Sequence, residues 1–329
     1  MVTRTPPSGA DGPEGVVWNP AERNWLLRAP WRSRLPQAHG SSAACPFCPG
    51  GAEALTAEAP HMVTSKFPFI IAPYDASYQA HRVLLFSPRH DRNLDALNLP
   101  ELTAVLNSVR DECSALLKHE SVRSVYAFQA SGALFGGSVS HPHLQVLGFP
   151  FVPTKLVLDH TRGCPLCAAS GRRDQLVSET DDFTLAVPSW SRLPYEMVIA
   201  PRRHLQSLDD CATEQIAVLL SQALRAIREI VPAEETPYTL NFMTAPVSPT
   251  EPDPPADGAG ETGQGADRVL RTDHHVRIEV FPFATDAGRI RQIIAIEAGA
   301  GVMLNPVPPA SAAARLREAV ARHPREKQA

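Results

Sequence analysis

The sequence predicts a fold of the α+β class, built from two consecutive modules of similar design. The chain has 329 residues, which is enough for about two domains. Two Cys-x-x-Cys pairs are each followed, in the same order, by an apolar segment, a histidine and an amphipathic stretch. Residues 100–119 and 212–230 carry apolar side chains at helical spacing, whereas the apolar segments before them are short, as strands are.

The composition limits the classes of function. Lys and Arg number 31 and Asp and Glu 35, so the formal net charge is −4. This charge argues against a general nucleic-acid or membrane-surface binder, although a few local cations could hold a small phosphate ligand. The sequence has no run of about 18 apolar residues, and residues 1–17 lack the apolar stretch of a signal peptide. We therefore expect a cytoplasmic protein whose cysteines are reduced.

Composition also suggests where the modules begin and end. We expect a disordered N-terminus at 1–17, a first module at 18–155, a second at 156–322 and a tail at 323–329. Residues 247–268 interrupt the second module with a segment rich in Pro, Gly and acidic residues. That composition is typical of disorder.

Two matched cysteine pairs indicate metal binding. They are Cys45-Pro46-Phe47-Cys48 and Cys164-Pro165-Leu166-Cys167. Two thiolates at this spacing can hold one tetrahedral metal from a tight turn, and in a reducing compartment a metal is favoured over a disulfide. A redox Cys-x-x-Cys is the alternative, but two matched pairs fit a repeated metal knuckle better. The other cysteines, Cys113 and Cys211, fall in predicted helical stretches and are expected to be buried.

Histidines supply the remaining ligands in the same order in both halves. His90 and His141 lie 51 residues apart, and His204 and His275 lie 71 apart. Without the 22 residues of the 247–268 insert the two intervals nearly match, so we interpret the halves as one module used twice. The predicted ligand sets are Cys45, Cys48, His90 and His141, and Cys164, Cys167, His204 and His275, with His274 as an alternative to its neighbour. Four protein ligands leave no open position, so zinc in either set would be structural.

The repeat alignment places the chemistry in the first half. The segment His141-Pro142-His143-Leu144-Gln145 aligns with His275-Val276-Arg277-Ile278-Glu279. Residues two apart in a strand face the same side, so His143 and Gln145 are expected beside the metal-anchored His141. A neutral imidazole at His143 is a good nucleophile near pH 7, and the Gln145 amide can donate to charge developing on a phosphoryl oxygen. The alternative for His143 is an ordinary half-buried histidine.

The loop before this strand is suited to phosphate. It reads Gly136-Gly137-Ser138-Val139-Ser140. Its glycines permit close approach of the backbone to a ligand, and its hydroxyl groups can bind phosphate oxygens.

These motifs resemble the galactose-1-phosphate uridylyltransferase family, the transferase branch of the histidine-triad superfamily. The resemblance spans residues 18–320, and its most specific element is the His-Pro-His-x-Gln motif at 141–145. It implies two tandem histidine-triad-like modules, each an antiparallel sheet with a helix, related by pseudo-twofold symmetry, and a homodimer. It also implies that His143 becomes nucleotidylated, that Gln145 stabilises the intermediate and that the first Cys/His set holds Zn²⁺. The second Cys/His set is similar to that of members with ADP-glucose phosphorylase activity.

The same resemblance assigns substrate-binding residues. Arg32 matches an arginine that reaches sugar phosphate, and Ser138 matches a serine that contacts phosphate. Ser65 and Lys66 fall in the segment that meets the nucleoside, and Gly136 and Gly137 fall in the loop before the active-site strand. Family members usually carry an amide where Ser65 stands, and the sequence leaves the nucleobase and the sugar open.

The implied function is a nucleotidyltransferase of carbohydrate metabolism, with galactose metabolism as the family's setting. It would move a nucleoside monophosphate from a nucleotide sugar to a sugar 1-phosphate by double displacement through His143. One alternative keeps this chemistry but uses inorganic phosphate as acceptor, as a nucleotide-sugar phosphorylase does. Another is a non-catalytic, zinc-containing nucleotide-binding protein.

Overall fold

The computed structural model describes most of the chain. The described residues are 15–19, 24–28, 45–51, 53–54, 60–64, 80–132, 139–158, 164–169, 171–231, 237–247, 274–283 and 293–322. Of the segments expected to be disordered or a tail, residues 1–14, 248–268 and 323–329 lie outside this part of the chain. Within it, no helix combines the length and the apolar character needed to cross a membrane.

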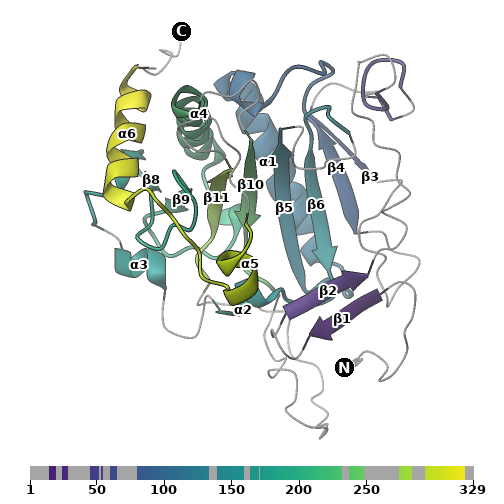
Figure 1. Cartoon of the computed structure of the whole chain (residues 1–329). Helices are drawn as coiled ribbons and strands as arrows, with labels where there is room; N and C mark the ends of the chain where they lie inside the picture. The colour runs from purple at the N-terminus through teal and green to yellow at the C-terminus, as the bar shows by residue number, and fades with distance from the viewer. Residues whose placement is uncertain are drawn as a thin grey trace, which may run out of the picture.

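An antiparallel sheet of nine strands forms the centre of the fold (Figure 1). Its order is β3-β4-β6-β5-β10-β11-β9-β8-β7. The strands of the first half are β3 (His61–Thr64), β4 (His81–Leu85), β5 (Ser124–Ser131) and β6 (Leu144–Phe149). Those of the second half are β7 (Leu176–Glu179), β8 (Phe183–Ala186), β9 (Met197–Pro201), β10 (Tyr238–Met243) and β11 (Arg277–Pro282). The α+β prediction is confirmed, and the halves share one sheet because β5 pairs with β10.

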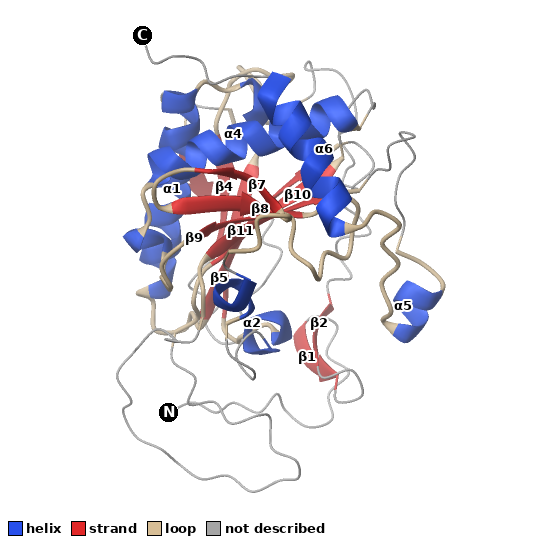
Figure 2. Ribbon diagram, turned by 90° about the vertical axis from the view of Figure 1, so that its left-hand side faces the viewer, coloured by secondary structure: helices blue, strands red, loops and turns tan. Residues whose placement is uncertain are grey.

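Three long helices cover one face of this sheet, as Figure 2 shows. They are α1 (Leu99–Leu117), α4 (Thr213–Ile230) and α6 (Pro309–Arg322). On the other side lie the short helix α2 (Thr154–Leu158) and the hairpin of β1 (Gly15–Asn19) and β2 (Asn24–Arg28). Two further short helices are α3 (Pro165–Ala169) and α5 (Ile296–Ala300). The open face is therefore the one available for a site.

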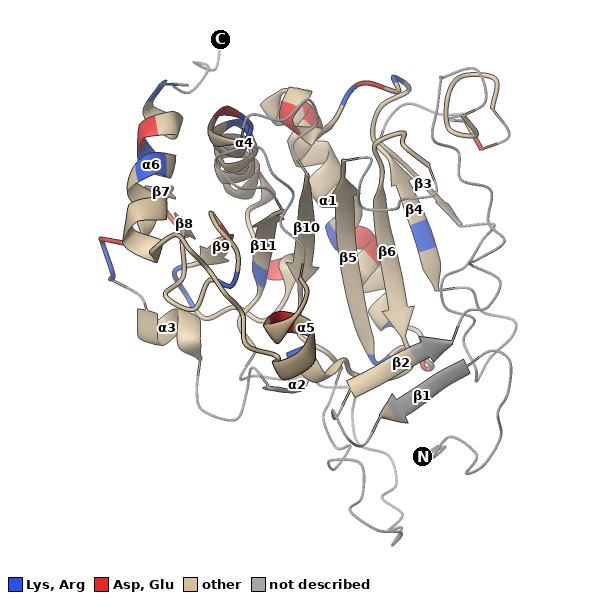
Figure 3. Cartoon of the chain, viewed as in Figure 1, with Lys and Arg blue, Asp and Glu red and all other residues tan. Residues whose placement is uncertain are grey.

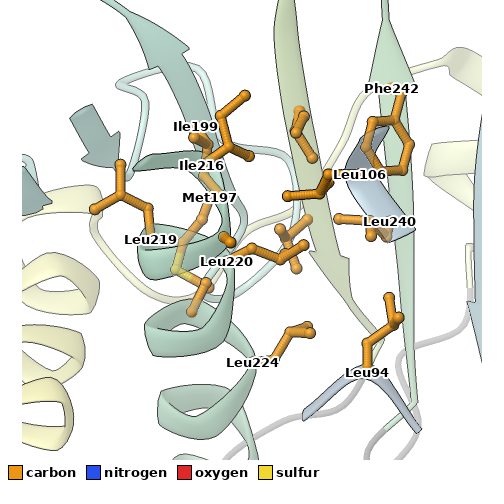
Figure 4. Packing of buried hydrophobic residues seen from close by; sticks show 14 of the residues in the cluster. Leu94, Leu106, Met197, Ile199, Ile216, Leu219, Leu220, Leu224, Leu240 and Phe242 are labelled. Carbon is orange, nitrogen blue, oxygen red and sulfur yellow. The ribbon is translucent and has the colours of Figure 1, made fainter. Parts of the chain in front are cut away.

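The two helices predicted from the sequence, at 100–119 and 212–230, are α1 and α4. α1 begins with a capping box, in which Asn98 accepts from the Glu101 backbone N–H and the Glu101 side chain accepts from the Asn98 N–H. Both helices turn an apolar stripe toward the sheet. Figure 4 shows Leu220 and Leu224 of α4 facing the same core as Met197 of β9 and Leu240 of β10.

The two cysteines outside the pairs are both buried, as expected. Cys113 lies within α1. Cys211 is not in an α-helix, because it ends the short 3₁₀ helix Leu208–Asp210 just before α4. The prediction of a helical environment was therefore wrong for Cys211. Its burial follows from packing between the 3₁₀ turn and the helix start.

The register places the repeat's key residues at matching positions on the sheet. Gln145 of β6 pairs with Phe128 of β5, which pairs with Asn241 of β10, which pairs with Glu279 of β11. The row continues to Val83 of β4 on one side and to Val198 of β9 on the other. Gln145 and Glu279 therefore stand equally far from the junction of the two halves.

Candidate active site and metal centres

The first Cys/His cluster is built on a tight turn at residues 45–51. The Gly51 N–H donates to the Cys48 carbonyl at 2.8 Å, and a Cβ on Gly51 would lie only 2.4 Å from the Pro46 carbonyl oxygen, so the turn requires glycine there. Cys48 Sγ lies 3.4 Å from His90 Nδ1 and 3.5 Å from His141 Nδ1. Tetrahedral zinc, with Zn–S about 2.3 Å and Zn–N about 2.0–2.1 Å, would hold sulfur and nitrogen about 3.6 Å apart. The four side chains therefore fit this ion.

The orientation of the histidine rings also fits a metal. His141 Nε2 donates to the Ser87 carbonyl at 2.9 Å, which leaves the Nδ1 lone pair facing the two cysteines. His90 uses Nε2 toward the Ser140 hydroxyl at 3.0 Å and likewise turns Nδ1 to Cys48. An outer hydrogen bond that fixes the ring in this way is typical of metal-ligating histidines. Burial is the main cause that raises the pKa of the Cys48 thiol, and the neighbouring Cys45 raises it further. A bound cation would stabilise the thiolate and oppose both effects.

The second Cys/His cluster has the same plan but is more exposed. Cys164 Sγ lies 3.2 Å from His275 Nδ1, and Cys167 Sγ lies 3.2 Å from His204 Nδ1. His275 Nε2 donates to the Pro201 carbonyl at 3.0 Å. Cys167 is exposed, whereas both cysteines of the first cluster are buried. In each cluster the four ligand atoms lie within 4.8 Å of one another.

The structure distinguishes His275 from its neighbour. His275 faces the second cluster, whereas His274 is buried with Nε2 directed to the Met243 carbonyl at 3.3 Å. Adjacent residues of an extended segment point in opposite directions, so only one of the two histidines could face the cysteines. The sequence did not show which one.

His143 stands beside the first cluster with one ring nitrogen already occupied. Its Nδ1–H donates to the His141 carbonyl at 2.7 Å, so the lone pair is on Nε2. The Gln145 amide nitrogen lies 3.4 Å from that Nε2. Burial of the ring lowers the pKa of His143 below its usual value, which favours the neutral form. The arrangement presents an unprotonated imidazole nitrogen next to an amide donor.

The aromatic residue of the first knuckle connects the cluster to His143. Phe47 is buried, and its ring centroid lies 5.4 Å from that of His143 and 6.0 Å from that of His141, in edge-on geometry. Because Phe47 stands between Cys45 and Cys48, the fold of the knuckle sets the wall against which the His143 ring rests.

One polar residue of the site was missed in the sequence. His81, at the start of β4, is 2% exposed, and its Nε2 lies 2.9 Å from Gln145 Oε1. The available signal was a histidine opening the apolar segment His81–Leu85, on the face shared with Val83. That signal alone could not identify Gln145 as the partner, since β4 and β6 meet only in the folded sheet.

The remaining predicted binding residues cannot be placed. They are Arg32, Ser65, Lys66, Gly136, Gly137 and Ser138, and all lie outside the residues the structure describes.

The corresponding place in the second half holds paired charges in place of the histidine and the glutamine. Arg277 Nε donates to Glu279 Oε1 at 2.8 Å, and Lys155 of α2 bonds the same carboxylate. Burial opposes ionisation of Glu279, but the charges of Arg277 and Lys155 outweigh it and hold the pKa of Glu279 below its usual value. Figure 3 shows both signs of charge on β11. These residues line a cavity of about 210 Å³ that Trp190 also borders.

Comparisons with known proteins find similarity to sugar-nucleotide enzymes. Residues 73–153 match the family model for the galactose-1-phosphate uridyl transferase N-terminal domain. The galactose-1-phosphate uridylyltransferase of Thermotoga maritima is 24% identical, with 92% of this chain and 97% of the relative covered. The ADP-glucose phosphorylase of Arabidopsis thaliana is 25% identical over 72% of this chain and 64% of its own length.

Solved structures show the same fold. A uridylyltransferase structure superposes with a TM-score of 0.77 at 20% identity, covering 94% of this chain and 99% of that one. The Arabidopsis thaliana ADP-glucose phosphorylase with bound ADP-glucose gives a TM-score of 0.64 at 21% identity, covering 92% and 98%. The resemblance drawn from the sequence motifs is thus confirmed: the chain is similar to galactose-1-phosphate uridylyltransferases in sequence, and residues 73–153 match the model of that family's N-terminal domain.

Proposed function

We propose that this chain is a nucleotidyltransferase that moves a nucleoside monophosphate from a nucleotide sugar to a sugar 1-phosphate. His143 Nε2 attacks the α-phosphorus, a nitrogen–phosphorus bond forms, and the bond to the bridging oxygen breaks, releasing the first sugar 1-phosphate. A phosphate oxygen of the second sugar 1-phosphate then attacks the nucleotidyl-histidine and frees His143. The observation that carries this proposal is the His143 ring, held at Nδ1 by the His141 carbonyl with Nε2 beside the Gln145 amide.

The other site residues have supporting roles in this proposal. Gln145 donates to a non-bridging phosphoryl oxygen as charge develops there. Ser138 and the backbone at Gly136 and Gly137 contact the phosphates, and Arg32 and Lys66 balance their charge, with Ser65 beside the nucleoside. These last assignments rest on the family resemblance and the sequence motifs.

Zinc is proposed for both clusters, in a structural role. Cys45, Cys48, His90 and His141 would hold the first ion, and Cys164, Cys167, His204 and His275 the second, as the ligand-atom distances allow. The ion supplies a rigid anchor for the strand that carries His143 and takes no part in the transfer.

The proposal extends to the organisation of the chain. Modules 18–155 and 156–322 would be related by a pseudo-twofold axis between β5 and β10, with support from the matching places of Gln145 and Glu279 on the sheet. A homodimer in the cytoplasm is proposed from the sequence and the family resemblance.

A second candidate keeps the first step and changes the acceptor. Inorganic phosphate would discharge the intermediate, and the product would be a nucleoside diphosphate, as expected of a nucleotide-sugar phosphorylase. The specific observation in its favour is the second Cys/His cluster, together with the similarity to a plant ADP-glucose phosphorylase.

Intact-mass spectrometry tests these proposals. The holoprotein is incubated separately with UDP-, ADP-, GDP- and CDP-sugars, with His143→Ala as control. An acid-labile adduct of nucleotide mass that is absent from the control supports His143 as nucleophile and identifies the base. Discharge by sugar 1-phosphate or by inorganic phosphate distinguishes transferase from phosphorylase. A folded, zinc-loaded protein that forms no adduct with any donor would favour a non-catalytic binding protein.

A further inference from the structure

A line of hydrogen bonds connects a backbone carbonyl to a residue outside the active-site motif. It begins at the His141 carbonyl, which accepts from His143 Nδ1 at 2.7 Å. It continues from His143 Nε2 to the Gln145 amide nitrogen, 3.4 Å away. It ends where Gln145 Oε1 meets His81 Nε2 at 2.9 Å.

The direction of every bond in this line follows from the carbonyl end. A carbonyl oxygen only accepts, so His143 carries a hydrogen on Nδ1, and in the neutral ring that a nucleophile requires the lone pair is on Nε2. The Gln145 atom that faces the lone pair must then be the amide nitrogen, which is a donor. Gln145 Oε1 consequently faces His81, and His81 Nε2 must carry a hydrogen.

This direction matters because the two ends of a glutamine amide are nearly equal in shape. Packing alone holds the group equally well after a half turn about its last torsion. The turned amide would point Oε1 at the His143 lone pair and at the phosphoryl oxygens, and these acceptors repel one another. A donor on the far side of the amide removes the ambiguity.

We infer that His81 is a positioning residue for the transfer reaction. Its Nε2–H holds Gln145 Oε1, so the NH₂ group stays aimed at the His143 nucleophile and the reacting phosphoryl group. The inference as it concerns rate rests on the proposed function, whereas the assignment of hydrogens does not.

The sheet explains why this contact forms. Val83 of β4 pairs with Gln145 of β6, and His81 pairs with Leu147, so His81 and Gln145 are diagonal neighbours on one face. Long side chains reach across such a diagonal. Within the sheet, His81 is 2% exposed, and so water does not compete effectively for Gln145 Oε1.

The second half lacks the equivalent pairing. Glu196, two residues before Val198, stands in the place of His81 relative to Glu279. Its carboxylate accepts from the backbone N–H of Arg192 at 2.7 Å and from that of Leu193 at 3.2 Å. The histidine–glutamine contact therefore accompanies the half that carries the nucleophile.

A double-mutant cycle tests the inference. Single-turnover transfer from a nucleotide sugar to His143 is measured for the holoprotein and for His81→Phe, Gln145→Ala and the double variant. We expect His81→Phe to slow the covalent step about 10- to 100-fold, the range for loss of an outer partner of a site residue, with little change in KM. In the Gln145→Ala background, His81→Phe should change the rate by less than about twofold. In the protein with Gln145 intact, His81→Gln keeps a donor and should retain most of the rate that His81→Phe loses.

Two results would overturn the inference. One is an unchanged rate in folded, zinc-loaded His81→Phe. The other is an equal loss from His81→Phe with and without Gln145, because His81 would then act through the fold. Glu196→Gln, at the corresponding place in the second half, is the matched control and should leave the covalent step unchanged.

A second measurement is independent of activity. ¹⁵N-histidine-labelled holoprotein is examined by ring nitrogen–proton correlation, with His81→Phe and His143→Ala to assign the signals. We expect a hydrogen on Nε2 of His81 and on Nδ1 of His143. A hydrogen only on Nδ1 of His81 would disprove the inference even if no nucleotide donor were accepted, whereas the expected tautomers without an adduct would count against the proposed function alone.

Discussion

Phe47 packs edge-on against His143, with ring centroids 5.4 Å apart. This contact joins the metal knuckle to the proposed nucleophile, since Phe47 lies between two cysteines of the first cluster. The knuckle thus does more than supply two candidate metal ligands, because it also limits the positions that the His143 ring can take.

Replacement of Phe47 by leucine should therefore slow the covalent step. The shorter side chain leaves space beside the His143 ring, and a nucleophile held less firmly reacts more slowly, here by about tenfold. Zinc content should remain at the parental level because both cysteines are kept. Single-turnover kinetics with elemental analysis check this. The matched control is Leu166→Ala in the second knuckle, and an equal effect of that variant would show that the contact with His143 is not the cause.

Metal loss should occur in two stages. Cys167 is exposed and Cys48 is buried, so a thiol reagent with a chromophoric chelator should release the second cluster's metal first. Cys167→Ser should lower zinc content by about one ion and leave nucleotidylation of His143 largely intact, whereas Cys48→Ser should abolish it. Release of both metals at one rate, or loss of activity with the first ion, would contradict this expectation.

The two long helices begin differently, and their stability should show it. Asn98 caps α1 in a capping box, whereas Ala212 at the start of α4 makes no side-chain cap. Asn98→Ala should destabilise the protein by about 0.5–2 kcal/mol, and Ala212→Ser should stabilise it by about the same amount at most. Urea unfolding of the holoprotein measures both. A loss of stability in Ala212→Ser would show that the new hydroxyl does not reach the free backbone N–H groups.

The paired charges around the buried Glu279 should affect the stability of the protein and not the rate of nucleotidyl transfer. Glu279→Gln leaves Arg277 and Lys155 without their shared carboxylate, which should cost about 3–5 kcal/mol of the free energy of unfolding. The rate of nucleotidylation should stay within about twofold of the parent, since these residues lie in the half without His143.

The same variant gives a pH test with a definite sign. Because the pKa of Glu279 is lower in the folded protein, its contribution is present above about pH 4.3, the ordinary value for glutamate. That contribution is lost as the pH falls through the lower, folded value. The stability difference between parent and Glu279→Gln should therefore be constant near neutral pH and narrow below about pH 4. A gap that widens on acidification would contradict the assigned charge state.

Much of this protein is determined by local pattern. Each Cys-x-x-Cys turn brings its own two thiols together, and the apolar spacing of 100–119 and 212–230 specifies helices without reference to the rest of the chain. The repeat predicted that His90 and His141 would join the first pair and that His204 and His275 would join the second, and the structure brings both sets together.

The tertiary structure decided those features of the site that require two particular strands to be neighbours. The pairing of β4 with β6 makes His81 the partner of Gln145, and the pairing of β5 with β10 makes one sheet of two halves. Residue spacing in the sequence predicts neither pairing, because strands that are far apart in the sequence can be hydrogen-bonded neighbours in a sheet. The sequence by itself predicted the candidate metal ligands and the proposed nucleophile, since these follow from residue type and spacing. The fold determined the direction of the Gln145 amide, since only a donor brought from another strand can distinguish its two ends.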